Sequence, residues 1–242
     1  MSISTQSQRD VSAVIARLFV YPVKSCAGVD VQEAVLTETG LDLDRAWKVV
    51  DATGRYVSQR EIPRLALVRP QFKSSELVLR APGMLALHLA IDGVEQPVRV
   101  RVWNYDTAGE DEVAAYDMGD IAAQWFTDFL SLSEQGLPAT QAPRFRLVRF
   151  DPQHQRLSSM KWTGGVAALN QFNDGYPLLV LGQASLEELN ARLQAGGHAA
   201  VGLDRFRPNI VVAGVHAGDG SRLGEMHRAA DPGPWVLAPG RP

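Results

Sequence analysis

Short apolar runs separated by turn signals dominate the N-terminal half of the chain. The runs are rich in Val, Leu and aromatic side chains, and turn formers such as Ala81-Pro82-Gly83 and Asp92-Gly93 stand between them. Many short strands at this spacing favour a barrel or a sandwich over alternating strands and helices. The pattern predicts strands at Val14–Tyr21, Lys48–Val50, Ala66–Phe72, Leu77–Arg80, Leu85–Ile91 and Val98–Trp103.

Helical periodicity replaces this pattern in residues 119–132. Ile121, Trp125 and Phe129 recur at every fourth position and would form one apolar face. Asp120 stands where an N-cap is expected, because its carboxylate can accept hydrogen bonds from the first free N–H groups of a helix. The segment is therefore predicted to be an amphipathic helix.

A second helix is predicted around residues 184–193. Ser185 and Glu188 have the spacing of a capping box, and Gly196-Gly197 follows as a stop signal. Its apolar face would consist of Leu186, Leu189 and Leu193. Further strands are predicted in residues 145–150, 177–182 and 209–215.

These elements predict a mostly β chain with some α+β character. The turn-rich segment 134–143 is the best candidate for a linker. We therefore expect a β-barrel-like domain over residues 13–133 and a second, mostly β domain with a few helices over residues 144–242. From Ala217 to Pro242 the periodicity fades, and no strand or helix is expected there.

Charge and composition exclude several classes of protein. The net charge of −3, from 24 basic and 27 acidic side chains, does not indicate nucleic acid or an anionic membrane as a partner. The polar N-terminus has no apolar core of a secretory signal, and the apolar runs are too short to span a bilayer. A single cysteine forms no internal disulfide. We therefore expect a cytoplasmic protein.

The segment 21-YPVKSCAGVD-30 contains that cysteine and allows two interpretations. A nucleophilic Cys26 would need a lowered pKa and a base, but none of the five histidines lies near it in sequence, nor do they have metal-ligand spacing. The alternative is a small buried cysteine beside an anion-binding turn. Lys24 offers a cation, Ser25 offers a hydroxyl, and Gly28 relaxes the turn so that backbone N–H groups can bind an anion.

Two other segments carry groups that suit an anion, and a third is a turn that would point a carboxylate and backbone amides into a cavity at the strand ends. Arg45 precedes an apolar strand in 44-DRAWKVVD-51, and Arg207 with Asn209 does so in 204-DRFRPNIVV-212. Asp174 lies in 173-NDGYP-177, a turn signal directly before another apolar run. Taken singly, each arginine is better explained by a surface ion pair with the neighbouring Asp44 or Asp204.

Together these segments resemble a known family. The chain contains, in this order, YPVKSCAG (21–28), DRAW (44–47), QREIPRL (59–65), FNDGYPLL (172–179), ASLEELNARL (184–193) and FRPNIVV (206–212). This order resembles the MOSC family (molybdenum cofactor sulfurase C-terminal domain) preceded by its N-terminal β-barrel domain. The chain is similar to bacterial relatives of the mitochondrial amidoxime-reducing component over about residues 13–214. The resemblance implies a β-barrel-like N-terminal domain and a MOSC β-barrel domain.

The resemblance also implies a function and a site. Members of this type bind a pterin molybdenum cofactor and use it for oxygen-atom transfer, reducing N-hydroxylated small molecules with electrons from a separate donor protein. A single cysteine builds no iron–sulfur cluster, which agrees with a separate donor. Carried over by motif, the expected cofactor contacts are Lys24, Ser25, Arg45, Asp174, Arg207 and Asn209.

One part of the family pattern has no counterpart here. Relatives carry a cysteine motif after FRPN[IL]VV, and one of its thiolates ligates molybdenum, whereas no cysteine follows Cys26 in this sequence. We expect the sequence after about Ala217 to be a truncated or out-of-frame ending. A protein without that thiolate could be inactive as an oxidoreductase.

Two alternatives to the oxidoreductase therefore stay open. One is a non-enzymatic carrier of the molybdenum cofactor or a sulfur-transfer accessory module, and the other is a β-rich domain whose basic residues form surface pairs. Pyridoxal phosphate binding would follow from family association only, because nothing in the chain resembles the pyridoxal-phosphate domain of the sulfurases.

Overall fold

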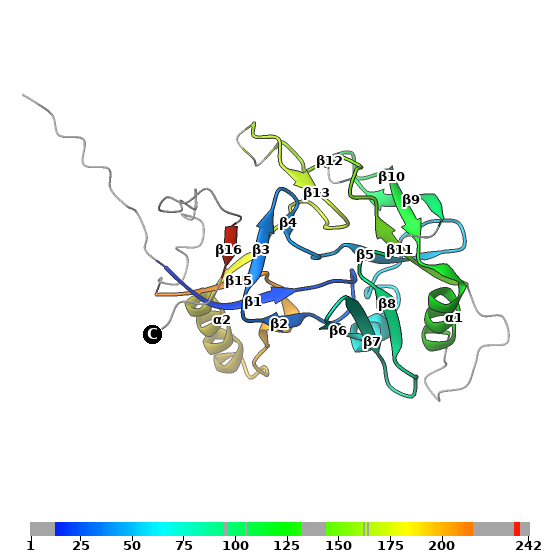
Figure 1. Cartoon of the computed structure of the whole chain (residues 1–242). Helices are drawn as coiled ribbons and strands as arrows, with labels where there is room; N and C mark the ends of the chain where they lie inside the picture. The colour runs from blue at the N-terminus through cyan, green and yellow to red at the C-terminus, as the bar shows by residue number, and fades with distance from the viewer. Residues whose placement is uncertain are drawn as a thin grey trace, which may run out of the picture. The chain divides into compact units, whose positions relative to one another are not determined.

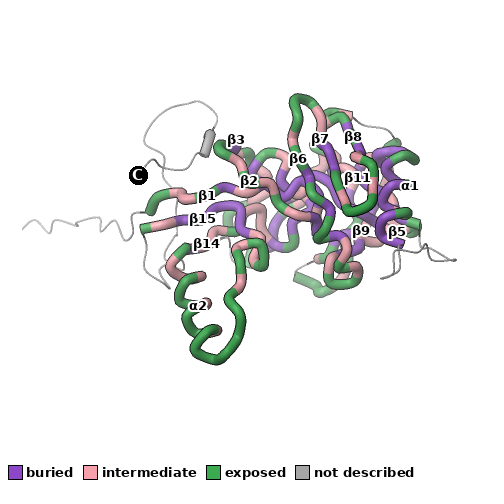
Figure 2. Tube along the Cα trace, turned by 90° about the horizontal axis from the view of Figure 1, so that it is seen from below, coloured by how far each residue is buried: buried purple, intermediate pink, exposed green. Residues whose placement is uncertain are grey.

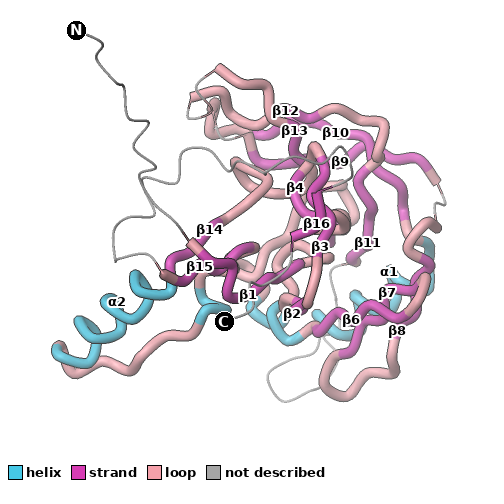
Figure 3. Tube along the Cα trace, turned by 60° about the vertical axis from the view of Figure 1, so that its left-hand side comes forward, coloured by secondary structure: helices cyan, strands magenta, loops and turns pink. Residues whose placement is uncertain are grey.

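The computed structural model confirms a mostly β fold. It describes residues 13–93, 96–104, 106–131, 144–161, 163, 165–214 and the strand at 235–237, and two α-helices occur among them (Figures 1 and 3). The expected linker 134–143 lies outside the described residues, as does the tail after Ala217 except for that strand. The expected domain bounds, 13–133 and 144–242, stay a prediction.

The chain divides into two compact units that are each discontinuous in sequence. One unit consists of residues 20–29 and 36–177, and the other of residues 1–19, 30–35 and 178–242. We call them the central unit and the terminal unit, and we describe each by itself.

A four-stranded antiparallel sheet is the framework of the central unit. Its strands are β5 (Trp47–Asp51), β9 (Pro97–Trp103), β10 (Glu110–Asp117) and β11 (Phe145–Phe150), in the order β5-β11-β10-β9 (Figure 1). Four successive residues of β5 are buried, and Figure 2 shows β5 and β11 in purple along most of their length. Because successive side chains of a strand point to opposite faces, both faces of this sheet must be covered.

One face packs on the helix α1 (Gly119–Leu130) and on a smaller sheet of β6 (Arg69–Lys73), β7 (Glu76–Arg80) and β8 (Leu87–Ala90). From α1, Phe126 and Phe129 are wholly buried there against Trp47 and Leu147. Burial of each such ring stabilises the fold by roughly 1.5–3 kcal/mol. The other face holds a second cluster, in which Val50, Val148 and Phe150 surround Phe172. Phe172 thereby fixes a loop of the candidate site to the sheet.

Short elements complete the central unit. They are β4 (Gly40–Leu41), which pairs with β3 (Ala34–Thr37), the two-stranded ribbon of β12 (Arg156–Leu157) and β13 (Leu169–Asn170), and the 3₁₀ helix η1 (Pro63–Leu67).

The terminal unit contains a four-stranded sheet in the order β14-β15-β1-β2. Its strands are β14 (Val180–Gly182), β15 (Ile210–Ala213), β1 (Val14–Val20) and β2 (Val29–Val31). β14 and β15 are parallel, and α2 (Gln183–Ala195) together with the 3₁₀ helix η2 (Leu203–Arg205) connects them. β1 runs antiparallel to β15, so the beginning of the chain pairs with a strand near its end.

The structure corrects several details of the expected helices. Ile121 is 81% exposed and does not belong to the apolar face of α1. Asp120 lies inside the first turn of α1, and Met118 occupies the N-cap position. The capping box is also wrong, because α2 begins at Gln183 and places Ser185 within the helix. The Gly196-Gly197 stop is confirmed, since Gly196 is the C-cap and Gly197 has a φ of +77°.

Seven of the described strands were not expected: β2, β3, β4, β10, β12, β13 and one in the tail. β10 was missed because its sequence EDEVAAYD is acidic, although Val113, Ala115 and Asp117 alternate as its buried side. The tail was expected to contain no strand, but β16 (Trp235–Leu237) lies in it.

Candidate functional site

Two of the sequence motifs run side by side in the central unit. The amide of Arg45 donates to the carbonyl of Tyr21 at 2.8 Å, and the amide of Trp47 donates to Pro22 at 3.0 Å. The amide of Lys24 donates back to Trp47 at 2.8 Å. These three bonds hold the turn around Lys24 against the segment that leads into β5.

The backbone at three expected site residues is strained. Ser25, Arg45 and Arg207 have φ angles of +69°, +51° and +57°, in the left-handed region that non-glycine residues rarely adopt. Such a conformation costs on the order of 1–3 kcal/mol and is concentrated at functional sites. The other described non-glycine residues with positive φ are Leu43, Ser74 and Ala108.

Lys24 and Asp174 lie far apart in the sequence of the central unit but contact each other in the fold. The Lys24 ammonium donates to Asp174 Oδ1 at 2.8 Å and to the Phe172 carbonyl at 2.6 Å. Burial lowers the pKa of Lys24, and Asp174 partly opposes that shift. Burial acts to raise the pKa of Asp174, but the charge and hydrogen bond of Lys24, together with the charges of Arg60 and Arg45, outweigh it and lower that pKa. One of the three ammonium hydrogens has no acceptor among the described residues.

Asp44 connects Arg45 to the same loop. Its Oδ1 accepts from the Tyr21 amide at 2.8 Å, and its Oδ2 accepts from Arg45 Nη1 at 2.5 Å and from Asn173 Nδ2 at 3.2 Å. The ion pair expected between Arg45 and Asp44 is present. It is buried rather than at the surface, because Asp44 is 1% exposed. Asp44 joins three motif segments within the central unit.

The Tyr21 ring explains the glycine in the first motif. The Arg45 guanidinium lies over this ring, 4.4 Å from its centroid. A Cβ at Gly28 would lie 2.5 Å from the ring, so this position needs glycine for close approach.

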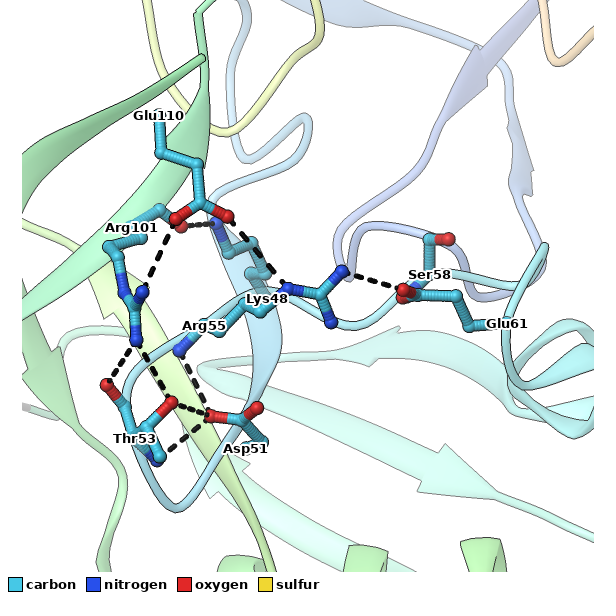
Figure 4. A network of polar contacts seen from close by, with 8 residues as sticks. All are labelled: Lys48, Asp51, Thr53, Arg55, Ser58, Glu61, Arg101 and Glu110. Carbon is cyan, nitrogen blue, oxygen red and sulfur yellow. Dashed lines mark hydrogen bonds and ion pairs between the residues drawn. The ribbon is translucent and has the colours of Figure 1, made fainter.

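Lys48 was not expected to belong to a site. It is 1% exposed, and its ammonium donates to the Arg101 carbonyl at 2.7 Å, while the Arg101 guanidinium contacts Thr53 and Glu110 (Figure 4). The Phe172 ring lies 4.8 Å from its Nζ. Burial lowers the pKa of Lys48 well below its ordinary value, and the positive charges of Lys24 and Arg156 lower it further. No sequence signal distinguished it, because it sits inside an apolar strand.

Arg156 was also missed. Its guanidinium donates to the carbonyls of residues 171, 173 and 174, which flank Phe172. It borders a hollow of about 40 Å³ that is open to solvent. Carboxylates of Asp106, Asp111 and Asp174 also line this hollow.

The remaining two expected residues belong to the terminal unit. Asn209 is 1% exposed, and its amide group accepts from the Leu179 N–H and donates to the Phe19 carbonyl, both at 3.2 Å. Its side chain thereby joins the chain before β14 to β1. The Arg207 amide donates to the Leu203 carbonyl at 3.1 Å, which closes the turn after η2. A cofactor contact of either residue stays a prediction.

Cys26 lies in the apolar core of the central unit at 0% exposure. A thiol so placed does not suit a nucleophile or a metal ligand, and the interpretation as a small buried cysteine agrees with the structure.

Comparison with known families identifies the chain. Residues 12–133 match the MOSC N-terminal beta barrel domain, and residues 169–230 match the MOSC domain. The chain belongs to the MOSC family. The motif-based resemblance is thereby confirmed, and association with the molybdenum cofactor is supported at the level of the family.

Its relatives include mitochondrial amidoxime reducing component 2 of Homo sapiens, 36% identical over 212 residues, and that of Rattus norvegicus, 34% identical over 213 residues. Each alignment covers 84% of this chain and 57% of the relative. The molybdenum cofactor sulfurase of Homo sapiens is 27% identical over 88% of this chain and 24% of the relative. The chain thus spans little more than half the length of the amidoxime-reducing components.

Two kinds of feature are absent from the described residues. They contain no group of three or more His, Cys, Asp or Glu side chains that could hold a metal ion. Neither described helix has the length and apolar character needed to cross a membrane.

The residues of the central unit fit the anionic part of a pterin cofactor. Lys24 and Arg45 provide positive charge, and one Lys24 hydrogen is available among the described contacts. The Oδ1 atom of Asn173 is buried without a donor, in the loop that also contacts Lys24. A buried acceptor of this kind would be satisfied by a ligand N–H. The metal would need another ligand, because Cys26 is buried in the core.

Proposed function

We propose that this MOSC protein binds a pterin molybdenum cofactor and, when loaded, reduces N-hydroxylated small molecules by oxygen-atom transfer. One observation carries the proposal: three motif segments that are far apart in sequence meet around Lys24, through its pair with Asp174 and through the Asp44–Asn173 bond. The names of the amidoxime-reducing relatives support the reaction type.

Each group of the site has a task that follows from its chemistry. Lys24 would donate its remaining hydrogen to the cofactor phosphate. Asp174 would keep the ammonium oriented toward the position of that phosphate. Ser25 and Arg45 would add a hydroxyl and a guanidinium, and Arg207 and Asn209 are proposed as further contacts. When bound, the cofactor would supply the redox chemistry of the metal. The electrons would come from a separate donor protein, and a cytoplasmic location stays a prediction.

The second candidate is a non-enzymatic cofactor carrier. The burial of Cys26 in the core favours it, because that thiol cannot anchor the metal. A carrier would hold the pterin through the same Lys24 and Arg45 groups but would not retain molybdenum in a reactive state.

Purification from a cofactor-producing host tests both candidates. Stoichiometric molybdenum and pterin, with reduction of an N-hydroxylated amidine by a chemical electron donor, would support the oxidoreductase. Pterin without metal or activity would support the carrier, and absence of pterin would contradict both.

The Lys24→Ala variant tests the residue on which the site is built. We expect it to lose most of its pterin, since the ammonium is the central cation of the three segments. Lys73→Ala is the matched control, because Lys73 is exposed at the end of β6. Full pterin content in folded Lys24→Ala protein would contradict the assignment of this site.

A further inference from the structure

Arg156 is hydrogen bonded entirely to backbone carbonyls. Nη1 donates to Gln171 at 2.5 Å and to Asn173 at 2.8 Å. Nη2 donates to Trp103 at 3.0 Å and to Asp174 at 3.2 Å. The two Nη atoms carry four hydrogens, and each hydrogen has one of these four acceptors.

The loop 171–174 is consequently held between two cations. Its carbonyls at residues 171, 173 and 174 accept from Arg156, whereas the intervening Phe172 carbonyl accepts from Lys24 at 2.6 Å. The Phe172 ring is wholly buried against the sheet. The backbone of this loop therefore has little freedom to move while both cations are in place.

Arginine is the side chain that this arrangement requires. Several carbonyl dipoles converge on one place and would repel one another without a cation between them. The planar guanidinium presents its hydrogens in a fixed fork and reaches four acceptors at once. A lysine ammonium has the same charge but only three hydrogens at a single point, so it cannot replace all four bonds.

We propose that Arg156 is a positioning residue for the cofactor site: it fixes the loop 171–174 so that the Phe172 carbonyl and the Asp174 carboxylate hold the Lys24 ammonium toward the cofactor. This inference rests on the proposed function, because that function makes Lys24 a cofactor contact. Arg156 acts through the loop, since its four Nη hydrogens bond to backbone carbonyls and leave only the Nε hydrogen unused among the described contacts.

A set of four proteins tests the inference. Wild type, Arg156→Lys, Arg156→Gln and the control Arg146→Gln are produced in a cofactor-producing host. Arg146 is a suitable control because it also makes several hydrogen bonds in the central unit, to Asp117 and Asp120, but none to the loop. Urea titration establishes that each protein is folded.

Two quantities are then measured. The first is the rate at which pterin is released after dilution. We expect Arg156→Lys and Arg156→Gln to release pterin roughly tenfold to a hundredfold faster than wild type, the range typical for loss of residues that orient metal-site ligands. Arg146→Gln should release it at the wild-type rate.

The second quantity is the NMR signal of the Lys24 ammonium in cofactor-free protein labelled with ¹⁵N-lysine. Hydrogen bonds to Phe172 and Asp174 should slow its exchange with water in wild type and in Arg146→Gln. We expect the signal to broaden or disappear in Arg156→Lys, because charge alone does not rescue the loop. This measurement does not depend on bound cofactor.

The outcomes separate the two proposals. If loaded Arg156→Lys releases pterin like wild type and keeps the Lys24 signal, the positioning role is overturned while the proposed function stands. If wild type carries no pterin, the proposed function is overturned, and this inference with it. If Arg156→Gln does not fold, Arg156→Lys decides the result, since it keeps the charge and most of the side-chain volume.

Discussion

Lys48 carries its ammonium inside the protein without a carboxylate partner among the described residues. One carbonyl, that of Arg101, and the rings of Tyr56 and Phe172 surround it. Transfer of a charge from water to such a place is unfavourable, which is why burial lowers the pKa of this lysine. The unfolded chain therefore binds the Lys48 proton more tightly than the native state does. Lys48 decreases the stability of the fold at every pH below its unfolded pKa near 10.5.

Replacement of Lys48 by methionine should make the cofactor-free protein more stable. We expect the free energy of unfolding to rise by about 1–3 kcal/mol at pH 7, as for other buried charges replaced by apolar groups. In wild type, stability should increase with pH between the lowered native pKa and the unfolded value near 10.5, because the unfolded chain binds more protons there.

Urea unfolding at several pH values between 7 and about 10 checks this expectation. Lys48→Met should lose the part of the pH slope that this lysine causes, so the two proteins approach each other in stability as pH rises. Lys73→Met is the control at an exposed position. Equal stability of Lys48→Met and wild type at every pH would contradict the account.

Single residues of the site were predictable to different degrees. Lys24, Arg45 and Asp174 could be selected because each lies in a motif at the end or beginning of an apolar run. Lys48 and Arg156 could not, because their partners are defined by tertiary contacts. The Lys48 acceptor lies 53 positions along the chain, and an isolated lysine in an apolar strand gives no signal of its own.

Among the elements, strands with a clear period of two or a continuous apolar run were predicted nearly at their observed places. β7, β9 and β11 are examples. β10 is an exception, because pairing with β9 and β11 stabilises an acidic segment that has low intrinsic strand preference. The N-cap residues of both helices were also misassigned, since the observed N-cap residues make no side-chain cap bond that a sequence pattern could reveal.

The turn after β1 is an element whose geometry depends on one glycine. Gly28→Ala would place a methyl group within 2.5 Å of the Tyr21 ring, and the ring would have to leave its position under Arg45. We expect a loss of about 1–3 kcal/mol in the free energy of unfolding, the usual cost of overpacking. Urea unfolding measures it.

A second background isolates the steric cause. Tyr21→Leu removes the ring that the new methyl group would meet, so Gly28→Ala should cost clearly less in that background than in wild type. An equal cost in both backgrounds would show that the glycine is needed for another reason.

For the whole molecule, the mostly β class was predictable because short apolar runs and turn formers are local signals. The division into compact units was not, because the terminal unit combines residues 1–19, 30–35 and 178–242. A partition of this kind depends on pairing between distant strands, such as β1 with β15. No local pattern specifies which distant strand is the partner.

At the same scale, cofactor binding should stabilise the folded chain. A ligand that binds only the native state adds about 2.7 kcal/mol when its concentration is a hundred times its dissociation constant. We therefore expect pterin-loaded protein to melt at a higher temperature than cofactor-free protein. Calorimetry checks this, and Lys24→Ala should melt at one temperature whether or not the host makes the cofactor.

The pairing of Val14 with Ala213 also has a consequence for synthesis of the protein on the ribosome. At 5–20 residues per second, β1 would wait on the order of 10–40 s for β15 to be made. During that time its hydrogen-bonding edge toward β15 is open and could join another nascent chain. The central unit, in contrast, can be completed earlier. We expect the yield of folded protein to depend on translation rate and on chaperones that cover this edge.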